Sequence, residues 1–206
     1  MKSKNYICLN GKKIEIGEDK LSEIKKALGV KGCFYIDKNE KGEQIAHVGK
    51  YEFLVLERSG DTIALLLKSH HKGNVQFGPN NDFRGSNVQK ICREFAEEIA
   101  AIVGEENIVE HTVDLTSDDG LRDYGKISEK CSLLTTDLYR RYVDILDLDQ
   151  LDKYWWLVTP WSTPRHESST LVKCVSPRGS IDFDSCNYGR IGVRPFLILK
   201  SHIFES

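Results

Sequence analysis

The sequence lacks the features that mark several large classes of protein. Its apolar runs are short, as at residues 63–67 (IALLL), whereas a membrane-spanning helix needs about 20 apolar residues, so we expect no membrane partner. It has no basic excess: Lys plus Arg number 29 against 31 for Asp plus Glu, which disfavours general nucleic-acid binding. The basic start of the chain is not followed by the apolar stretch of a signal peptide, so we expect the cytoplasm of the host cell.

Motifs for metals, nucleotides and hydrolysis are missing as well. The six cysteines lie far apart with no Cys-x-x-Cys pair, which argues against zinc ribbons and redox motifs. We expect mostly buried free thiols, with three disulfides in an exported protein as the alternative. There is no phosphate-binding loop, dinucleotide fingerprint or nucleophile elbow. We therefore predict no cofactor, no metal and no catalytic residue.

The length of 206 residues suits one domain with a small appendage. Residues 1–30 predict a β-β-α unit: a hairpin that turns at Asn10-Gly11, then a helix that begins near Glu18 and ends at Gly29. This appendage is either a packing arm or an element for homo-oligomers and partner docking. Residues 31–206 form the main domain.

The sequence of the main domain predicts a series of strands, then two helices, then further strands. Apolar patterns predict early strands at 33–36, 44–48, 51–57 and 62–68, the last two buried on both faces. A helix over 88–103 is preceded by Ser86 as cap and ended by Gly104, and a second covers 136–146 after a long polar connection at 105–131. Late strands are predicted at 154–158, 170–176, 181–184 and 193–199. This order indicates an α+β fold.

The segment from His111 to Asp123 carries oxygen ligands for a hard cation, but its spacing is not that of an EF-hand. We favour a helix cap and first turn at residues 117–119. A further alternative is that Cys131 is a catalytic nucleophile with His111 or His166 as its base. We favour a buried structural role for this thiol.

All three tryptophans lie within seven positions. Trp155 and Trp156 are adjacent in a predicted strand, so one faces the core and the other faces the opposite layer or solvent. Trp161 follows Pro160 in a polar loop and is the better candidate for an exposed contact. The alternative is that all three pack in the core.

These residues begin a longer pattern with three parts and two supporting helical segments. The parts are YWWLVTP at 154–160, VSPRGSI at 175–181 and GVRPFLIL at 192–199, with the helix at 88–103 and LLTT at 133–136. The pattern resembles a bacterial and bacteriophage domain family of unknown function with the hallmark Trp-Trp-Leu-Arg-Ser-Pro and a closing Gly-Val-Arg-Pro. Here Val158-Thr159 replaces the Arg-Ser of that hallmark, which removes any role that rests on its arginine.

The strand order is also similar to C-type-lectin-like and formylglycine-generating-enzyme-like folds. This similarity implies a C-type-lectin-like α+β domain with a mixed or antiparallel sheet and two main helices, whose loops at 73–85 and 161–169 present a binding surface. The residues expected to bind a partner are Asn81, Asp82, Arg84, Trp161, Arg165 and His166. Trp155, Trp156 and Arg194 are expected in the core, with Arg194 in an ion pair with Asp114, Asp118 or Asp119.

The first functional hypothesis is a non-enzymatic protein, encoded by a phage or prophage, that binds a protein or glycan partner. It is either virion-associated or an intracellular inhibitor of a host defence protein. The second is a metal-dependent enzyme that uses the segment from His111 to Asp123. The third is a structural assembly subunit that forms oligomers through residues 1–30.

Overall fold

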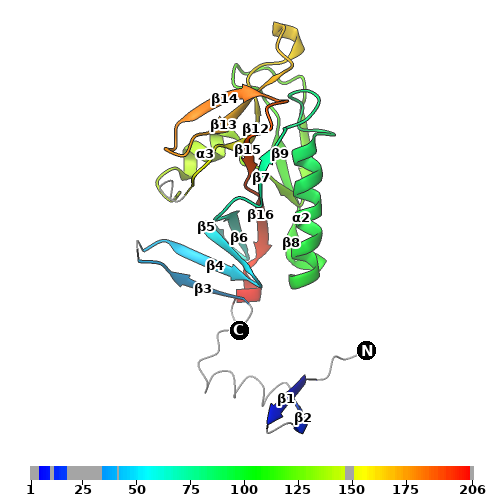
Figure 1. Cartoon of the computed structure of the whole chain (residues 1–206), viewed down its shortest axis with the longest axis vertical. Coiled ribbons are helices and arrows are strands. Elements are labelled where there is room, and N and C mark those ends of the chain that lie inside the picture. The colour runs from blue at the N-terminus through cyan, green and yellow to red at the C-terminus, as the bar shows by residue number, and fades with distance from the viewer. Residues whose placement is uncertain (1–4, 10–11, 18–33, 41, 147–150, 205–206) are drawn as a thin grey trace.

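The computed structural model describes residues 5–9, 12–17, 34–40, 42–146 and 151–204 (Figure 1). Strands β1 (Asn5–Leu9) and β2 (Lys12–Ile16) pair antiparallel, with Asn5 opposite Ile16. These are the two strands of the predicted hairpin. Its turn at residues 10–11, the predicted helix from Glu18 and the predicted boundary at residue 30 lie outside the described residues.

The first large sheet has the order β11-β16-β6-β5-β4-β3, and β8 also pairs with β16. Its strands β3 to β6 correspond to the predicted early strands. All of its pairs are antiparallel. Its strands are β3 (Phe34–Lys38), β4 (Gln44–Val48), β5 (Tyr51–Ser59), β6 (Thr62–Leu67), β8 (Ile108–Val109), β11 (Cys131–Ser132) and β16 (Phe196–Lys200). Successive residues of β5 and β6 point into two different apolar clusters, which confirms that both strands are buried on both faces.

The second sheet has the order β14-β13-β12-β15-β7, and its pairs are antiparallel except β12 with β15. Its strands are β7 (Lys72–Val75), β12 (Trp155–Pro160), β13 (Leu171–Val175), β14 (Ile181–Ser185) and β15 (Ile191–Val193). A separate ribbon pairs β9 (His111–Asp114) with β10 (Lys126–Glu129). Short 3₁₀ turns η1 (Glu105–Asn107), η3 (Pro164–His166) and η4 (Ser201–Phe204) complete the backbone.

The two predicted helices are present, and the second is shorter than expected. Helix α2 (Asn87–Val103) begins where the Ser86 side chain accepts a hydrogen bond from the Gln89 N–H, and it ends at Gly104 with φ of 88°. Helix α3 (Thr136–Tyr142) is capped by Thr135 and stops four residues before the predicted end at 146. Beyond Tyr142 the backbone makes i→i−3 bonds, which tighten the chain out of the α-helix.

The fold is therefore α+β with two helices and mostly antiparallel sheets. In Figure 1 the two large sheets lie one above the other, and α2 runs along one side of the molecule. Trp156 packs in one apolar cluster and Trp155 in the other, so the strand alternation predicted for them is confirmed. The opposite layer is a second core.

Three predicted segments differ from the structure. The polar connection at 105–131 contains strands β8 to β11, each of two to four residues, too short to give a clear alternating pattern. The loop predicted to start at residue 73 begins with β7, and the strand predicted at 193–199 is divided between β15 and β16. Its break at Arg194-Pro195 is where the chain passes from the second sheet to the first.

Arg194 is fully buried at this crossing, as expected for a core residue. Its Nε donates to the Leu67 carbonyl (2.6 Å) and its Nη2 to the Lys68 carbonyl (3.2 Å), while the guanidinium lies 5.3 Å from the Trp155 ring centre. Asp114, Asp118 and Asp119, the partners expected for an ion pair with Arg194, are not paired with it. The three carboxylates named for it interact with other cations: Asp114 with Lys126, Asp118 with Lys173 and Arg140, and Asp119 with His166.

No helix in the described part of the chain is long and apolar enough to cross a membrane.

Candidate functional site

Hydrogen bonds between three loops, residues 80–84, 115–125 and 161–170, join Asn81, Arg165 and His166 to residues of a neighbouring loop. The same loops contain the other residues predicted to bind a partner, Asp82, Arg84 and Trp161. We call these three loops the loop cluster. The loop at 161–170, gold in Figure 1, forms one tip of the molecule. Two of these loops are the predicted ones, and the middle loop comes from the acidic segment.

Asn81 is the central brace of the loop cluster. Its Nδ2 donates to the carbonyls of Ser162 (2.9 Å) and Leu171 (3.1 Å), and its Oδ1 accepts from the Tyr124 hydroxyl (2.7 Å). The residue is fully buried. The prediction that Asn81 contacts a partner is wrong, because its amide is already used to hold the loops together.

Arg84 and Asp82 form the exposed rim beside this brace. The Arg84 guanidinium makes a bidentate contact with the Asp82 carboxylate and lies 5.6 Å from the Tyr124 ring centre. The Arg84 side chain is 47% exposed, whereas Asp82 is largely covered. Arg84 therefore offers its remaining surface outward, and Asp82 holds it in place.

Two carboxylates tie the middle loop to the tip. Asp119 accepts hydrogen bonds from Ser162 Oγ (2.6 Å) and pairs with His166 Nδ1 (2.9 Å). Hydrogen bonds from Ser117 and Ser162 hold the pKa of Asp119 well below its usual range, with desolvation opposing them.

Asp123 makes the second tie, to Thr163 Oγ1 and to the Arg165 guanidinium. Arg165 and His166 remain more than half exposed. Residues 117–120 form a turn closed by a bond from the Gly120 N–H to the Ser117 carbonyl, so the helix predicted at 117–119 is wrong. The side chains of Asp119 and Asp123 in this loop instead interact with residues of the loop at 161–170.

Trp161 meets a second exposed aromatic ring that the sequence did not single out. Its ring centre lies 4.5 Å from that of Phe183 in β14, and Lys173 Nζ lies 4.7 Å from the Trp161 ring centre. Trp161 is 38% exposed and Phe183 is 42% exposed. Lys173 also pairs with Asp118 (3.3 Å). We call Trp161, Phe183 and Lys173 the aromatic patch. The one sequence signal that could have indicated an exposed Phe183 is its position between Asp182 and Asp184.

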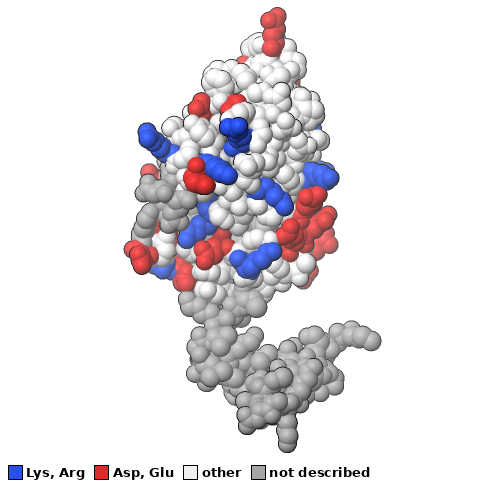
Figure 2. Space-filling view, in the orientation of Figure 1, with Lys and Arg blue, Asp and Glu red and all other residues white. Residues whose placement is uncertain are grey.

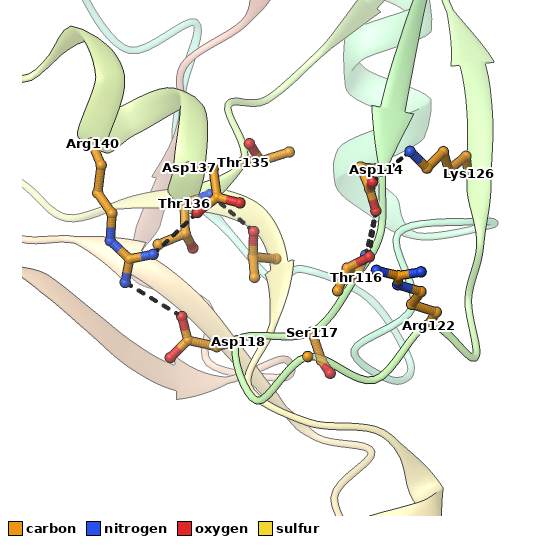
Figure 3. A pocket seen from close by; sticks show the side chains of 12 residues that line it. Asp114, Thr116, Ser117, Asp118, Arg122, Lys126, Thr135, Thr136, Asp137 and Arg140 are labelled. Carbon is orange, nitrogen blue, oxygen red and sulfur yellow. Dashed lines mark hydrogen bonds and ion pairs between the residues drawn. The ribbon is translucent and has the colours of Figure 1, made fainter.

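A pocket of about 560 Å³ is drawn in Figure 3, and its lining includes Asp118, the ion-pair partner of Lys173. We call it the polar pocket. It is formed by the segment 114–126, the first turns of α3 and Thr159 of β12. Desolvation would raise the pKa of Asp114 at its edge, but hydrogen bonds from Thr116 and Lys126 outweigh that effect and lower it to about 2. The Asp114 carboxylate is thus ionised at neutral pH.

Thiol chemistry at Cys131 is disfavoured. Burial raises the pKa of Cys131 well above its usual value, and the neighbouring Cys92 raises it further, so the reactive thiolate is scarce. His111 Nε2 lies 2.9 Å from Ser132 Oγ, and burial lowers the pKa of this histidine to about 4. The prediction of buried free thiols is confirmed for Cys92, Cys131, Cys174 and Cys186.

Among the described residues, no group of three His, Cys, Asp or Glu side chains is arranged to hold a metal ion. The carboxylates of the acidic segment lie beside lysine, arginine or histidine side chains. On the face drawn in Figure 2, Lys and Arg lie among Asp and Glu, with no broad basic area in the part that is described.

Comparison with known proteins gives no match to a family model, to a curated protein or to a solved structure.

Proposed function

We propose that this chain is a non-enzymatic binding protein that recognises a protein partner through the aromatic patch and the adjoining loop cluster. The observation that carries the proposal is the contact of two exposed aromatic side chains, Trp161 and Phe183, on a surface whose loops are tied by buried hydrogen bonds. Tryptophan, aromatic neighbours and arginine are the residues that contribute most to protein interfaces.

The bracing supports this proposal through the entropy of binding. Asn81, Asp119 and Asp123 each bond to the tip, so its arrangement is set before a partner arrives. A surface that is ordered in advance loses less conformational entropy on binding. Arg84, Arg165 and His166 of the adjoining loop cluster carry exposed polar groups, as residues at the rim of an interface do.

A protein partner fits this surface better than a glycan. Sugars stack on an open aromatic face, and Lys173 lies over the Trp161 ring here. The tilt of 51° between the Trp161 and Phe183 rings gives an uneven apolar surface suited to interlocking side chains. The resemblance of residues 154–160 and 192–199 to the phage domain family supports a phage or prophage origin. The similarity of strand order to C-type-lectin-like folds supports a lectin-like scaffold. Together they leave a virion component and an inhibitor of a host defence protein as the two settings.

The experiment compares capture from bacterial lysate by the wild-type protein, Trp161→Ala, Phe183→Ala and Tyr154→Ala. Tyr154 is the matched control because it is 39% exposed and lies outside the aromatic patch. We expect a protein that wild type and the Tyr154 variant retain, with affinity reduced at least about 30-fold in the Trp161 variant.

Equal retention by all four proteins would place the interface elsewhere. Retention that persists after protease treatment of the lysate and is lost after glycosidase treatment would instead identify a glycan. The assembly role of residues 1–30 stays a separate prediction, which light scattering of the full chain against a chain that begins at residue 31 would decide.

A further inference from the structure

The polar pocket is lined by three kinds of polar group. Its cations are Arg122, Lys126 and Arg140, and its carboxylates are Asp114, Asp118 and Asp137. Hydroxyl groups come from Thr116, Ser117, Thr135, Thr136 and Thr159. Its volume of about 560 Å³ lies within the range of small-molecule sites.

The hydrogen-bond donors of the polar pocket are not fully used by the protein. Arg122 has no ion pair within the described part of the chain. Arg140 is held loosely, 3.7 Å from Asp118 and 3.2 Å from the exposed Asp137. Figure 3 shows Arg122 and Arg140 on opposite sides of the pocket. Two guanidinium groups in the pocket lining therefore have N–H donors available to an oxygen-rich ligand.

A buried hydroxyl gives a second, independent indication of a ligand. Thr136 is only 2% exposed, and its Oγ1 has no hydrogen-bond partner among the described residues, although the side chain lines the pocket. Thr159 Oγ1 accepts from the Thr136 N–H (2.9 Å), and its own proton has no described acceptor. Buried hydroxyls without partners cost free energy, and a ligand oxygen would relieve that cost.

The carboxylates limit the ligand to one with donors of its own. Asp114 accepts from Thr116 and Lys126. Asp118, which also pairs with Lys173, and Asp137 keep acceptor capacity beside Arg140. A bare anion would meet three cations and three carboxylates and gain little net attraction. A molecule with an anionic group at the guanidinium groups and hydroxyls at the carboxylates satisfies both.

We propose that the polar pocket binds a small phosphorylated polyol, in the chemical class of the sugar phosphates. The phosphate monoester lies between Arg122 and Arg140 and accepts from the Thr136 and Thr159 hydroxyls, while the polyol hydroxyls donate to Asp118 and Asp137. Arginine suits this role because its planar donors match phosphate oxygens. The proposal does not rest on the aromatic patch or on its protein partner.

The test is isothermal titration of the full chain with glucose 6-phosphate, inorganic phosphate and glucose at low ionic strength. We expect 1:1 binding of glucose 6-phosphate with a dissociation constant at or below about 1 mM, weaker binding of inorganic phosphate and none of glucose. Arg122→Gln is expected to weaken glucose 6-phosphate binding about tenfold. Arg178→Gln, at an exposed arginine on the turn between β13 and β14, is the matched control and is expected to bind as wild type does.

Thr136→Val separates a ligand-binding role from a structural one. Valine keeps the shape of threonine and the N–H bond to Thr159, and it removes the unpartnered hydroxyl. We expect about fivefold weaker glucose 6-phosphate binding, with a melting temperature of the unliganded protein no lower than that of wild type. The proposal is overturned if glucose 6-phosphate does not saturate the protein, if inorganic phosphate binds as tightly, or if Arg122→Gln leaves binding unchanged.

Discussion

His111 makes the stability of the fold depend on pH in a window that can be calculated. The histidine lies in β9, where its Nε2 meets Ser132 Oγ (2.9 Å) and its ring packs edge-on against Phe196 with centres 5.1 Å apart. Burial lowers its pKa from 6.5 in the unfolded chain to about 4 in the fold. Neutral imidazole is therefore the form that the folded protein favours.

The sign and size of the effect follow from proton binding. Between pH 6.5 and 4 the unfolded chain binds the proton more readily, so the stabilising contribution is full above pH 6.5 and is lost as pH falls. The pKa difference corresponds to about 3 kcal/mol of unfolding free energy in total, of which about 2 kcal/mol is lost by pH 5.

The assay is urea unfolding of wild type and His111→Gln at pH 8 and pH 5. Glutamine does not titrate, so the unfolding free energy of the variant is expected to fall by about 2 kcal/mol less over this interval. His70 and His71 also have pKa values lowered by burial, and because both proteins contain them, their contribution cancels in the comparison. Equal pH dependence in the two proteins would refute the burial of an uncharged His111.

Three further substitutions test the fold by the same urea assay. Ser86→Ala removes the cap of α2 and is expected to cost about 1 kcal/mol; an unchanged midpoint would count against the cap. Gly192→Ala places a Cβ about 2.2 Å from His70 Cδ2, and the overpacking is expected to cost about 1–3 kcal/mol, whereas wild-type stability would contradict this close approach. Arg194→Met leaves the buried Leu67 carbonyl without its donor and is expected to cost about 2 kcal/mol, so a neutral result would argue against those hydrogen bonds.

The elements found from the sequence are those with strong local signals. Helix α2 was predictable because its apolar residues recur on one face and because Ser86 and Gly104 mark its ends. The exposure of Trp161 was predictable from its place after Pro160 in a polar loop. Strands β8 to β11 were missed because two to four residues carry too little pattern, and their pairing comes from partners far along the chain.

For the site residues, too, the sequence located the loops, and the tertiary structure assigned the role of each residue. The sequence placed Asn81, Arg84 and His166 among functional loops, and it had no means to separate a buried brace from an exposed rim. That separation depends on which carbonyls and carboxylates the folded chain brings within hydrogen-bond distance. Phe183 acquires its importance only because β13 carries β14 to the side of Trp161.

By itself, the sequence determined the α+β order of elements and the alternation of Trp155 and Trp156, because these depend on neighbours in the chain. The tertiary structure alone decided that Arg194 bonds to backbone carbonyls, that the acidic segment is tied to the tip of the molecule, and that the polar pocket holds an unpartnered Thr136 hydroxyl. Those outcomes depend on which distant groups share a buried site, and burial is what makes the partner of a charge or a hydroxyl matter energetically.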